Sequence, residues 1–186
     1  MLTFTKMRKE IFKEIEIPSG IEVEIVGSLM KVKGPEGESQ RRFNLKKVSL
    51  EKKDNLIVIG NKKATKKEKK LINSAAAHIR NMIAGVQRKF EYMLKVCFSH
   101  FPISVDIKGN EVLIKNFLGE RIPRKTIIPQ GVEVEVNKDV IKVSSVDKEL
   151  AGQVAANFET ATRIRKRDRR IFQDGIFLTN KAGRDI

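Results

Sequence analysis

An internal repeat restricts this sequence to folds that are built from two similar units. When Gly27 is aligned with Gly109, the stretch 34–38 falls on 116–120, and both stretches end in Gly-Glu. With one small gap, the helical patterns that follow also align. A match that covers strands and a helix together indicates a duplicated supersecondary unit.

A rival alignment is open, because Pro18–Ile25 resembles Pro129–Val136. This alignment covers one strand and leaves the two helical patterns out of phase. We therefore base the prediction of two tandem units on the first alignment.

The first repeat shows strand patterns followed by a helix pattern. Ile21–Ile25 alternates apolar and acidic residues and turns into 29–33, which predicts a β-hairpin. Two further strands are expected at 41–50 and 55–59. Thr65-Lys66-Lys67-Glu68 has the form of a capping box, which predicts the start of a helix. The apolar stripe expected on this helix consists of Leu71, Ala75, Ile79, Met82 and Val86.

The second repeat follows the same order and closes with a helix expected over 147–162. We expect its strands at 92–98, 103–107, 112–114, 132–136 and 140–143. The pattern predicts an α+β fold of two tandem duplicated domains, each an antiparallel β-sheet with one helix packed on it. We place the first domain at 1–87, its duplicate at 88–175 and a basic tail at 176–186.

The chemistry of the chain changes where the second helix pattern ends. Leu150, Val154 and Phe158 recur at helical spacing and define an apolar face. Continuing this helix would put Arg165 in the middle of that face, where an apolar residue belongs. We therefore expect the core-facing pattern to stop near Thr162.

The segment Arg163–Arg170 is the strongest candidate for contact with a partner. Its like charges at spacing i, i+4 would cost about 0.2–0.5 kcal/mol for each pair in a free helix. The planar guanidinium group suits phosphate contacts and stacking on bases. The net charge of +15, from 38 Lys and Arg against 23 Asp and Glu, favours nucleic acid first and an anionic membrane surface second. The alternative is a solvated basic segment.

Residues after this segment extend the candidate site. Phe172 offers a ring for stacking, unless it packs on the second sheet, and Gln173 offers an amide for a base edge or the RNA backbone. Asp174-Gly175 is expected to form a turn. Lys181 and Arg184 continue the positive charge into a tail that we expect to be disordered without its partner. The candidate residues for contact with a nucleic acid are Arg163, Arg165, Lys166, Arg167, Arg169, Arg170, Phe172, Gln173, Lys181 and Arg184.

Two other basic regions are compatible with binding and with plain solvation. Arg41-Arg42 with Lys46-Lys47 is expected on a strand face. The lysines of 62–70 surround the expected start of the first helix, whose free amides favour phosphate.

No residue pattern indicates catalysis, a metal site, a cofactor or a small-molecule substrate. Cys97 is the single cysteine, which excludes a disulfide framework and favours a reducing, cytoplasmic compartment. His78 and His100 have no ligand at metal spacing, so we expect structural roles for them. No apolar run reaches the ~18 residues of a membrane span. The first residues lack the apolar core of a secretory signal.

Three segments resemble the family of the sixth protein of the large ribosomal subunit. They are Ile17–Val23, Val32–Glu38 and Asp147–Asn157, and the resemblance extends over about residues 9–177. The ending 163–177 is similar to that of archaeal and eukaryotic members. Bacterial members end instead in a basic segment rich in Pro, Tyr and Gly.

The resemblance implies a non-enzymatic structural constituent of the large ribosomal subunit, built from two α+β domains. It also implies that large-subunit ribosomal RNA binds chiefly to the second domain and its C-terminal basic segment. The implied position is near the factor-binding side, by the sarcin–ricin region, with neighbouring ribosomal proteins and translation factors close by. Carried over by position, the RNA contacts fall on the basic residues of 163–170, with Phe172 and Gln173.

The alternatives are a free-standing nucleic-acid-binding protein and a subunit of an RNA-processing enzyme. The sequence lacks clustered carboxylates that could hold a divalent metal, which argues against a nuclease.

Overall fold

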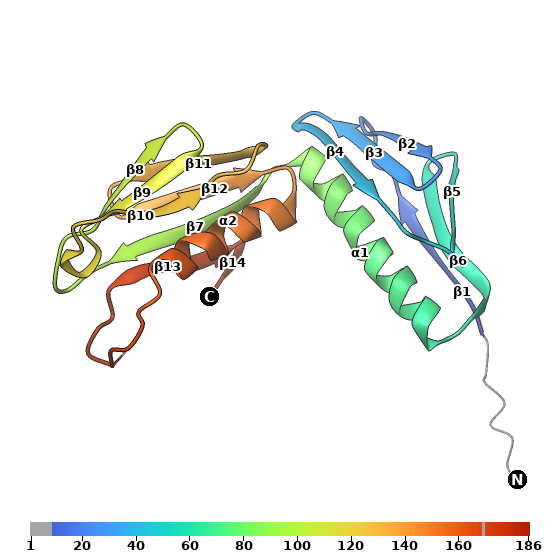
Figure 1. Cartoon of the computed structure of the whole chain (residues 1–186). Helices are drawn as coiled ribbons and strands as arrows, with labels where there is room; N and C mark the ends of the chain where they lie inside the picture. The colour runs from blue at the N-terminus through green and yellow to red at the C-terminus, as the bar shows by residue number, and fades with distance from the viewer. Residues whose placement is uncertain (1–8, 169) are drawn as a thin grey trace, which may run out of the picture. The chain divides into compact units, whose positions relative to one another are not determined.

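The computed structural model describes residues 9–168 and 170–186. The chain forms two compact units that meet between Arg88 and Lys89. Figure 1 shows one long helix and several antiparallel strands in the first unit, and the same kinds of element in the second.

The first unit contains two three-stranded antiparallel sheets, in the strand orders β1-β6-β5 and β2-β3-β4. Its helix packs against strands of both sheets. The elements are β1 Lys9–Glu16, β2 Glu22–Val26, β3 Leu29–Gly34, β4 Gly37–Arg42, β5 Ser49–Lys53, β6 Leu56–Ala64 and α1 Lys66–Gln87.

The capping box predicted for α1 is confirmed. The Thr65 N–H donates to Glu68 Oε2 at 2.9 Å, and the Lys67 N–H donates to Thr65 Oγ1 at 3.4 Å. The hydrogen bond from the Thr65 side chain lowers the pKa of Glu68. Of the predicted apolar stripe, Leu71 is 46% exposed and the adjacent Ile72 is buried instead, whereas the other four residues are buried as predicted.

The second unit repeats this arrangement and adds to it. Its sheets have the orders β10-β9-β8 and β11-β12-β7-β13-β14. The helix again packs against strands of both sheets. The elements are β7 Phe90–Cys97, β8 Ser104–Lys108, β9 Glu111–Lys115, β10 Arg124–Ile127, β11 Val132–Asn137, β12 Val140–Ser145, α2 Lys148–Ala161, β13 Gly175–Lys181 and β14 Arg184–Asp185, with a 3-10 turn η1 at Phe117–Gly119.

The topology confirms the predicted duplication. The order β1-β6-β5 corresponds to β7-β12-β11, and β2-β3-β4 corresponds to β8-β9-β10. Gly27 and Gly109 occupy equivalent turns with φ of 60° and 61°. The α+β class is therefore correct, but each unit has two sheets where we expected one.

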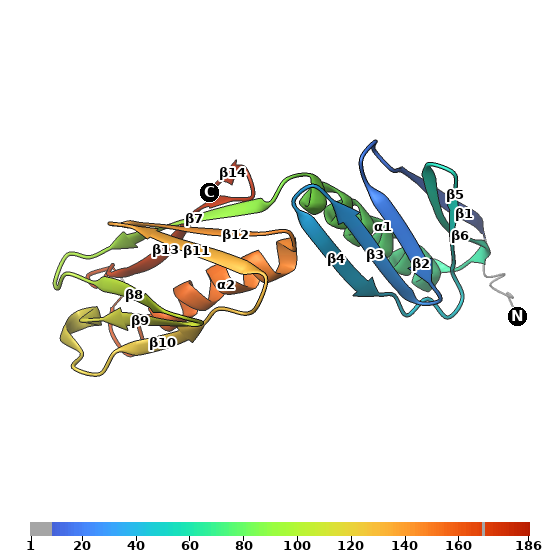
Figure 2. The same ribbon diagram turned by 90° about the horizontal axis from the view of Figure 1, so that it is seen from above.

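The C-terminal residues differ from the prediction of a disordered basic tail at 176–186. Residues 175–181 form β13, which pairs antiparallel with β7, so that Ile176 lies opposite Val96 and Leu178 opposite Leu94. Ile176 is buried in the core of this unit. Strands β12 and β13 are the two neighbours of β7 in this sheet (Figure 1), and Figure 2 gives the same unit from above. The apolar run in this strand is only three residues long, Ile176–Leu178, which is too short to predict a strand from the sequence.

The strand expected over 41–50 was also wrong in its extent. The structure divides it between β4 and β5, joined by a loop over 43–48. Phe43 and Val48, at the ends of this loop, are buried and hold it against the unit.

Candidate nucleic-acid interface

The arginine loop, defined as residues 163–173, connects α2 to β13 (Figure 1). Helix α2 ends at Ala161, with Thr162 as its C-cap, which confirms the prediction that the core-facing pattern stops near Thr162. Arg169 lies outside the described residues. The loop therefore begins where burial of the helix ends.

The last turn of α2 holds the outer edge of β13. Thr162 is 3% exposed, and its hydroxyl donates to the Phe158 carbonyl at 3.2 Å and accepts the Ile176 N–H at 2.9 Å. Glu159 Oε1 accepts the Leu178 N–H at 3.0 Å. These side chains satisfy amides that the strand does not use for pairing, so both ends of the arginine loop are fixed to one another.

Replacing Thr162 with valine is expected to destabilise the second unit by about 1–3 kcal/mol, because the buried Ile176 N–H loses its acceptor. Tyr92, the one tyrosine of the chain, lies in β7, so its fluorescence during urea unfolding reports on this unit. The matched control is Thr160→Val in the same turn, at an exposed position. Equal stability of the two variants would contradict a role for the Thr162 hydroxyl.

The cations of the arginine loop point largely to solvent. Arg170 pairs with the neighbouring Asp168 at 2.9 Å, but its own side chain stays almost fully exposed. Within the described residues, Arg163, Arg165 and Lys166 take part in no ion pair, and all are exposed. In the part of the chain that the structure describes, no acidic side chain pairs with these three cations, and they are available to an external anion.

A buried carboxylate fixes the end of the loop. Asp174 was expected in a turn, but it is 0% exposed and accepts hydrogen bonds from residues that follow β7. Its Oδ1 accepts from the Ser99 N–H at 3.1 Å, the Ser99 hydroxyl at 2.9 Å and His100 Nδ1 at 3.0 Å. Its Oδ2 accepts from the His100 N–H at 3.3 Å. Burial acts to raise the pKa of Asp174, but these hydrogen bonds outweigh it and lower the pKa to about 2.

Asp174 also supports Arg167, through the rings of His100 and Phe172. The His100 ring stacks on Phe172, with ring centroids 4.9 Å apart and planes inclined by 21°. The Arg167 guanidinium lies over the Phe172 ring, 4.8 Å from its centroid. A cation over an aromatic ring is favoured by the ring quadrupole. Asp174, His100, Phe172 and Arg167 thus form a continuous set of contacts from the buried anchor to an exposed cation.

Ser99, His100 and Asp174 do not form a hydrolytic triad. The Ser99 hydroxyl and the Asp174 carboxylate both lie on His100 Nδ1, at 3.1 Å and 3.0 Å. In a triad the serine and the carboxylate contact opposite ring nitrogens. Because the Asp174 carboxylate is ionised, Nδ1 must carry the proton that it donates, and the cluster serves to position the chain.

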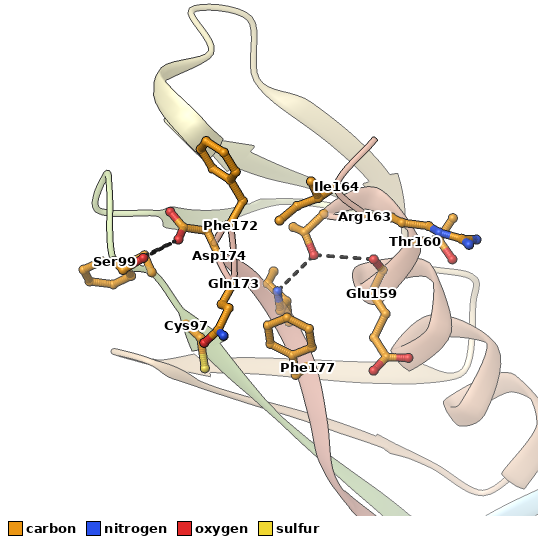
Figure 3. A pocket seen from close by; sticks show the side chains of 13 residues that line it. Cys97, Ser99, Glu159, Thr160, Arg163, Ile164, Phe172, Gln173, Asp174 and Phe177 are labelled. Atoms are coloured by element: carbon orange, nitrogen blue, oxygen red, sulfur yellow. Dashed lines mark hydrogen bonds between the residues drawn. The ribbon is translucent and has the colours of Figure 1, made fainter. Parts of the chain in front are cut away.

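A hollow of about 750 Å³ lies between the last turn of α2, the arginine loop and the first residues of β13. Figure 3 shows Phe172 and Phe177 on opposite sides of it, with Ile164 and Glu159 at one flank and Gln173 at the other. The hollow connects two of the predicted site residues, Phe172 and Gln173, with residues that the sequence analysis did not select.

Lys181 and Arg184 are separated from the arginine loop. Their backbones lie opposite each other in the β13–β14 hairpin, at the end of β13 that is farther from the arginine loop. At a rise of ~3.3 Å per residue, β13 carries Lys181 about 20 Å from Gly175. Both side chains are exposed, but the structure does not bring them to the same site.

Arg124 supports the site and was missed by the sequence analysis. Its Nη1 donates to the Ala161 carbonyl at 2.7 Å, so that a cation from β10 caps the C-terminal end of α2. It also lies 4.2 Å from the centroid of the Phe117 ring and pairs with Glu120 at 2.6 Å. No local pattern could reveal this role, because the contacts come from separate elements.

Comparison with known proteins gives consistent matches. The model of the family described as Ribosomal protein L6 matches residues 17–89 and 101–175. The chain is 45% identical to the large ribosomal subunit protein uL6 of Methanothrix thermoacetophila, over 94% of this chain and 99% of that protein. It is 44% identical to the protein of the same name from Nanoarchaeum equitans, over 97% of this chain and 98% of that protein. No helix in the described part of the chain is long and apolar enough to cross a membrane.

Proposed function

This chain belongs to the ribosomal protein L6 family, and we propose that it binds large-subunit ribosomal RNA through its second unit, with the arginine loop as the main contact. Its relatives are named as proteins of the large ribosomal subunit, so the chain is a structural constituent of that subunit in the cytoplasmic ribosome and not an enzyme. Family membership also disfavours the two alternatives, a free-standing nucleic-acid binder and a subunit of an RNA-processing enzyme.

The observation that supports this proposal is an exposed cationic loop with rigid ends. Thr162 and Glu159 hold one end to β13, and Asp174 holds the other to the residues after β7. Fixing the loop in advance lowers the conformational entropy that is lost on binding. Guanidinium groups at fixed positions neutralise phosphates and orient the protein on folded RNA without reading its sequence.

The position of the site in the ribosome is a further part of the proposal. The resemblance to the family supports a location near the factor-binding side, by the sarcin–ricin region, with neighbouring ribosomal proteins in contact and translation factors close by. Lys181 and Arg184, at the far end of β13, would meet a different part of the RNA from the arginine loop.

Ultraviolet crosslinking of intact large subunits tests this assignment. We expect RNA crosslinks on peptides that contain residues 163–173, and fewer on peptides from α1 and its flanking strands. Crosslinks confined to the first unit would contradict the proposed role of the arginine loop. Crosslinks on the loop that map far from the sarcin–ricin region would overturn only the proposed location.

A further inference from the structure

We propose that the hollow beside the arginine loop binds one unstacked nucleobase of the RNA, and that guanine fits it best. This inference rests on the proposed function, because RNA held by the loop would present the base. Proteins recognise single-stranded RNA largely by stacking splayed bases on aromatic rings and by bonding to their edges. The hollow offers both kinds of contact.

The hollow has room for a base and one exposed aromatic ring, Phe177, on which the base can stack. Its volume is about 750 Å³, and it is lined by Phe172 and Phe177 together with Ile164 (Figure 3). Phe177 is 46% exposed, which leaves apolar ring surface in contact with water. Covering that ring with a planar base removes apolar area from water, which is favourable.

The position of Phe177 depends on a glycine. A Cβ built on Gly175 would lie 3.1 Å from Phe177 Cζ and 3.2 Å from Cε2, closer than is comfortable for ordinary contacts. The absence of a side chain at Gly175 therefore leaves room for the end of the Phe177 ring to lie against β13. This places the ring at the wall of the hollow.

Glu159 gives the hollow a polar edge that suits a base and not a phosphate. The Leu178 N–H donates to its Oε1 at 3.0 Å and fixes the carboxylate. No hydrogen bond to Glu159 Oε2 is found among the described residues, and an ionised carboxylate acts as an acceptor only. A negative group beside the arginine loop repels phosphate, but it can accept hydrogen bonds from a base edge. Guanine carries two adjacent donors on its Watson–Crick edge, N1–H and the N2 amino group, whereas uracil carries one donor.

The loop explains how a base would reach this hollow. Arg163 lines the hollow, and Arg165 and Arg167 lie two and four positions further along the arginine loop. Phosphates bound to these guanidinium groups would lie close to the opening. A base attached to such a phosphate and turned out of its stack could then enter the hollow and stack on Phe177, while Phe172, whose ring already contacts His100 and Arg167, forms the opposite wall. Stacking on an aromatic side chain contributes enough for roughly a tenfold gain in affinity.

The test compares two short single-stranded RNAs, an all-uridine oligomer and the same oligomer with one central guanosine. The full chain is expected to bind the guanosine-containing oligomer about tenfold more tightly by fluorescence anisotropy, because guanine presents two donors to the Glu159 carboxylate and hydrogen bonds to a charged group are strong. Phe177→Ala and Glu159→Gln are expected to abolish this preference. Phe177→Ala should weaken binding of the all-uridine oligomer less than binding of the guanosine-containing oligomer, since any base can stack on the ring. Glu159→Gln should leave the affinity for the all-uridine oligomer unchanged or slightly higher, since a negative charge is lost.

The matched control is Phe101→Ala, because Phe101 is also 46% exposed in the same unit but does not line the hollow. This control is expected to retain the preference for guanosine. Thermal unfolding of each variant checks that the second unit is intact. Equal affinities of the unaltered chain for the two oligomers would overturn the inference, as would an equal fold-loss of affinity for both oligomers in Phe177→Ala, which would retain the preference. Either result leaves the proposed function standing, whereas a failure of both the oligomers and ribosomal RNA to bind in a salt-dependent manner would count against the proposed function itself.

Discussion

Replacing Arg163, Arg165 and Arg167 together with alanine is expected to weaken binding to large-subunit ribosomal RNA by about one to two orders of magnitude near 0.1 M salt. All three side chains are exposed on the arginine loop, and no ion pair within the described residues neutralises them. Each lost phosphate contact should reduce the slope of log affinity against log salt by up to about one unit. Filter binding over a series of salt concentrations measures both quantities.

The charge-matched control removes three exposed lysines from the first unit, as Lys62→Ala, Lys63→Ala and Lys66→Ala. It changes the net charge by the same amount, so any effect of net charge alone should appear in both variants. We expect this control to retain most of the affinity and of the salt dependence. An unchanged salt slope in the arginine variant would mean that those side chains touch no phosphate. Equal losses of RNA affinity in the two variants would indicate general electrostatic attraction to RNA instead of binding at a defined site.

Replacing Asp174 with alanine is expected to destabilise the second unit by about 3 kcal/mol and to weaken RNA binding. The substitution removes the acceptor for both backbone and side-chain donors of Ser99 and His100. It also releases the ring stack that supports Arg167. Urea unfolding followed through Tyr92 measures the loss of stability. Should the variant fail to fold, Ser99→Ala removes one side-chain donor and is expected to cost about 1 kcal/mol.

Asp174 also predicts a pH dependence of stability. Its pKa falls from an ordinary 3.8 to about 2 in the folded chain, so the folded state binds the proton less readily than the unfolded state. The stability that the ionised Asp174 carboxylate contributes is therefore fully present above about pH 4 and is lost as the pH falls toward 2. The variant Asp174→Ala should lose less stability over this range than the unaltered chain.

The control for this pH effect is Asp106→Ala, which removes a half-exposed carboxylate that pairs with Lys115 at 2.6 Å. Exposed pairs of this kind contribute little to stability. A stability curve for Asp174→Ala that runs parallel to that of the unaltered chain between pH 4 and 2 would contradict the anchoring role of the carboxylate.

Much of the fold could be predicted from the sequence because its signals are local. Alternation in Ile21–Ile25 and the capping box at Thr65 depend on neighbours within a few positions, and both correspond to observed elements. The repeat that aligns Gly27 with Gly109 conveys the topology as well, since equivalent strands have the same partners in each unit. The exposure of Arg163 and Arg165 follows from the end of the apolar face of α2.

The rest of the site could not be predicted because it depends on distant partners. His100 and Asp174 are separated by 74 positions, and neither sequence context suggests the other. An aspartate before a glycine usually indicates a turn. Here, the hydrogen bonds that Ser99 and His100 donate make burial of the Asp174 carboxylate favourable. The apolar residues Ile176 and Leu178 are too few to indicate a strand until the free edge of β7 is known. Arg124 likewise gains its role from the end of a helix on another element.

The pairing of β13 with β7 also imposes an order on folding. During synthesis, β7 leaves the exit tunnel long before β13, and every element from β8 to α2 is made in between. The elements from β8 to α2 can pack together first, because contacts between residues close in sequence form faster than contacts between residues far apart in sequence. The arginine loop then acquires its fixed ends only when β13 docks. A nascent chain halted before β13 would carry these positive charges on an unanchored end, with the edge of β7 left open to strand addition from other chains.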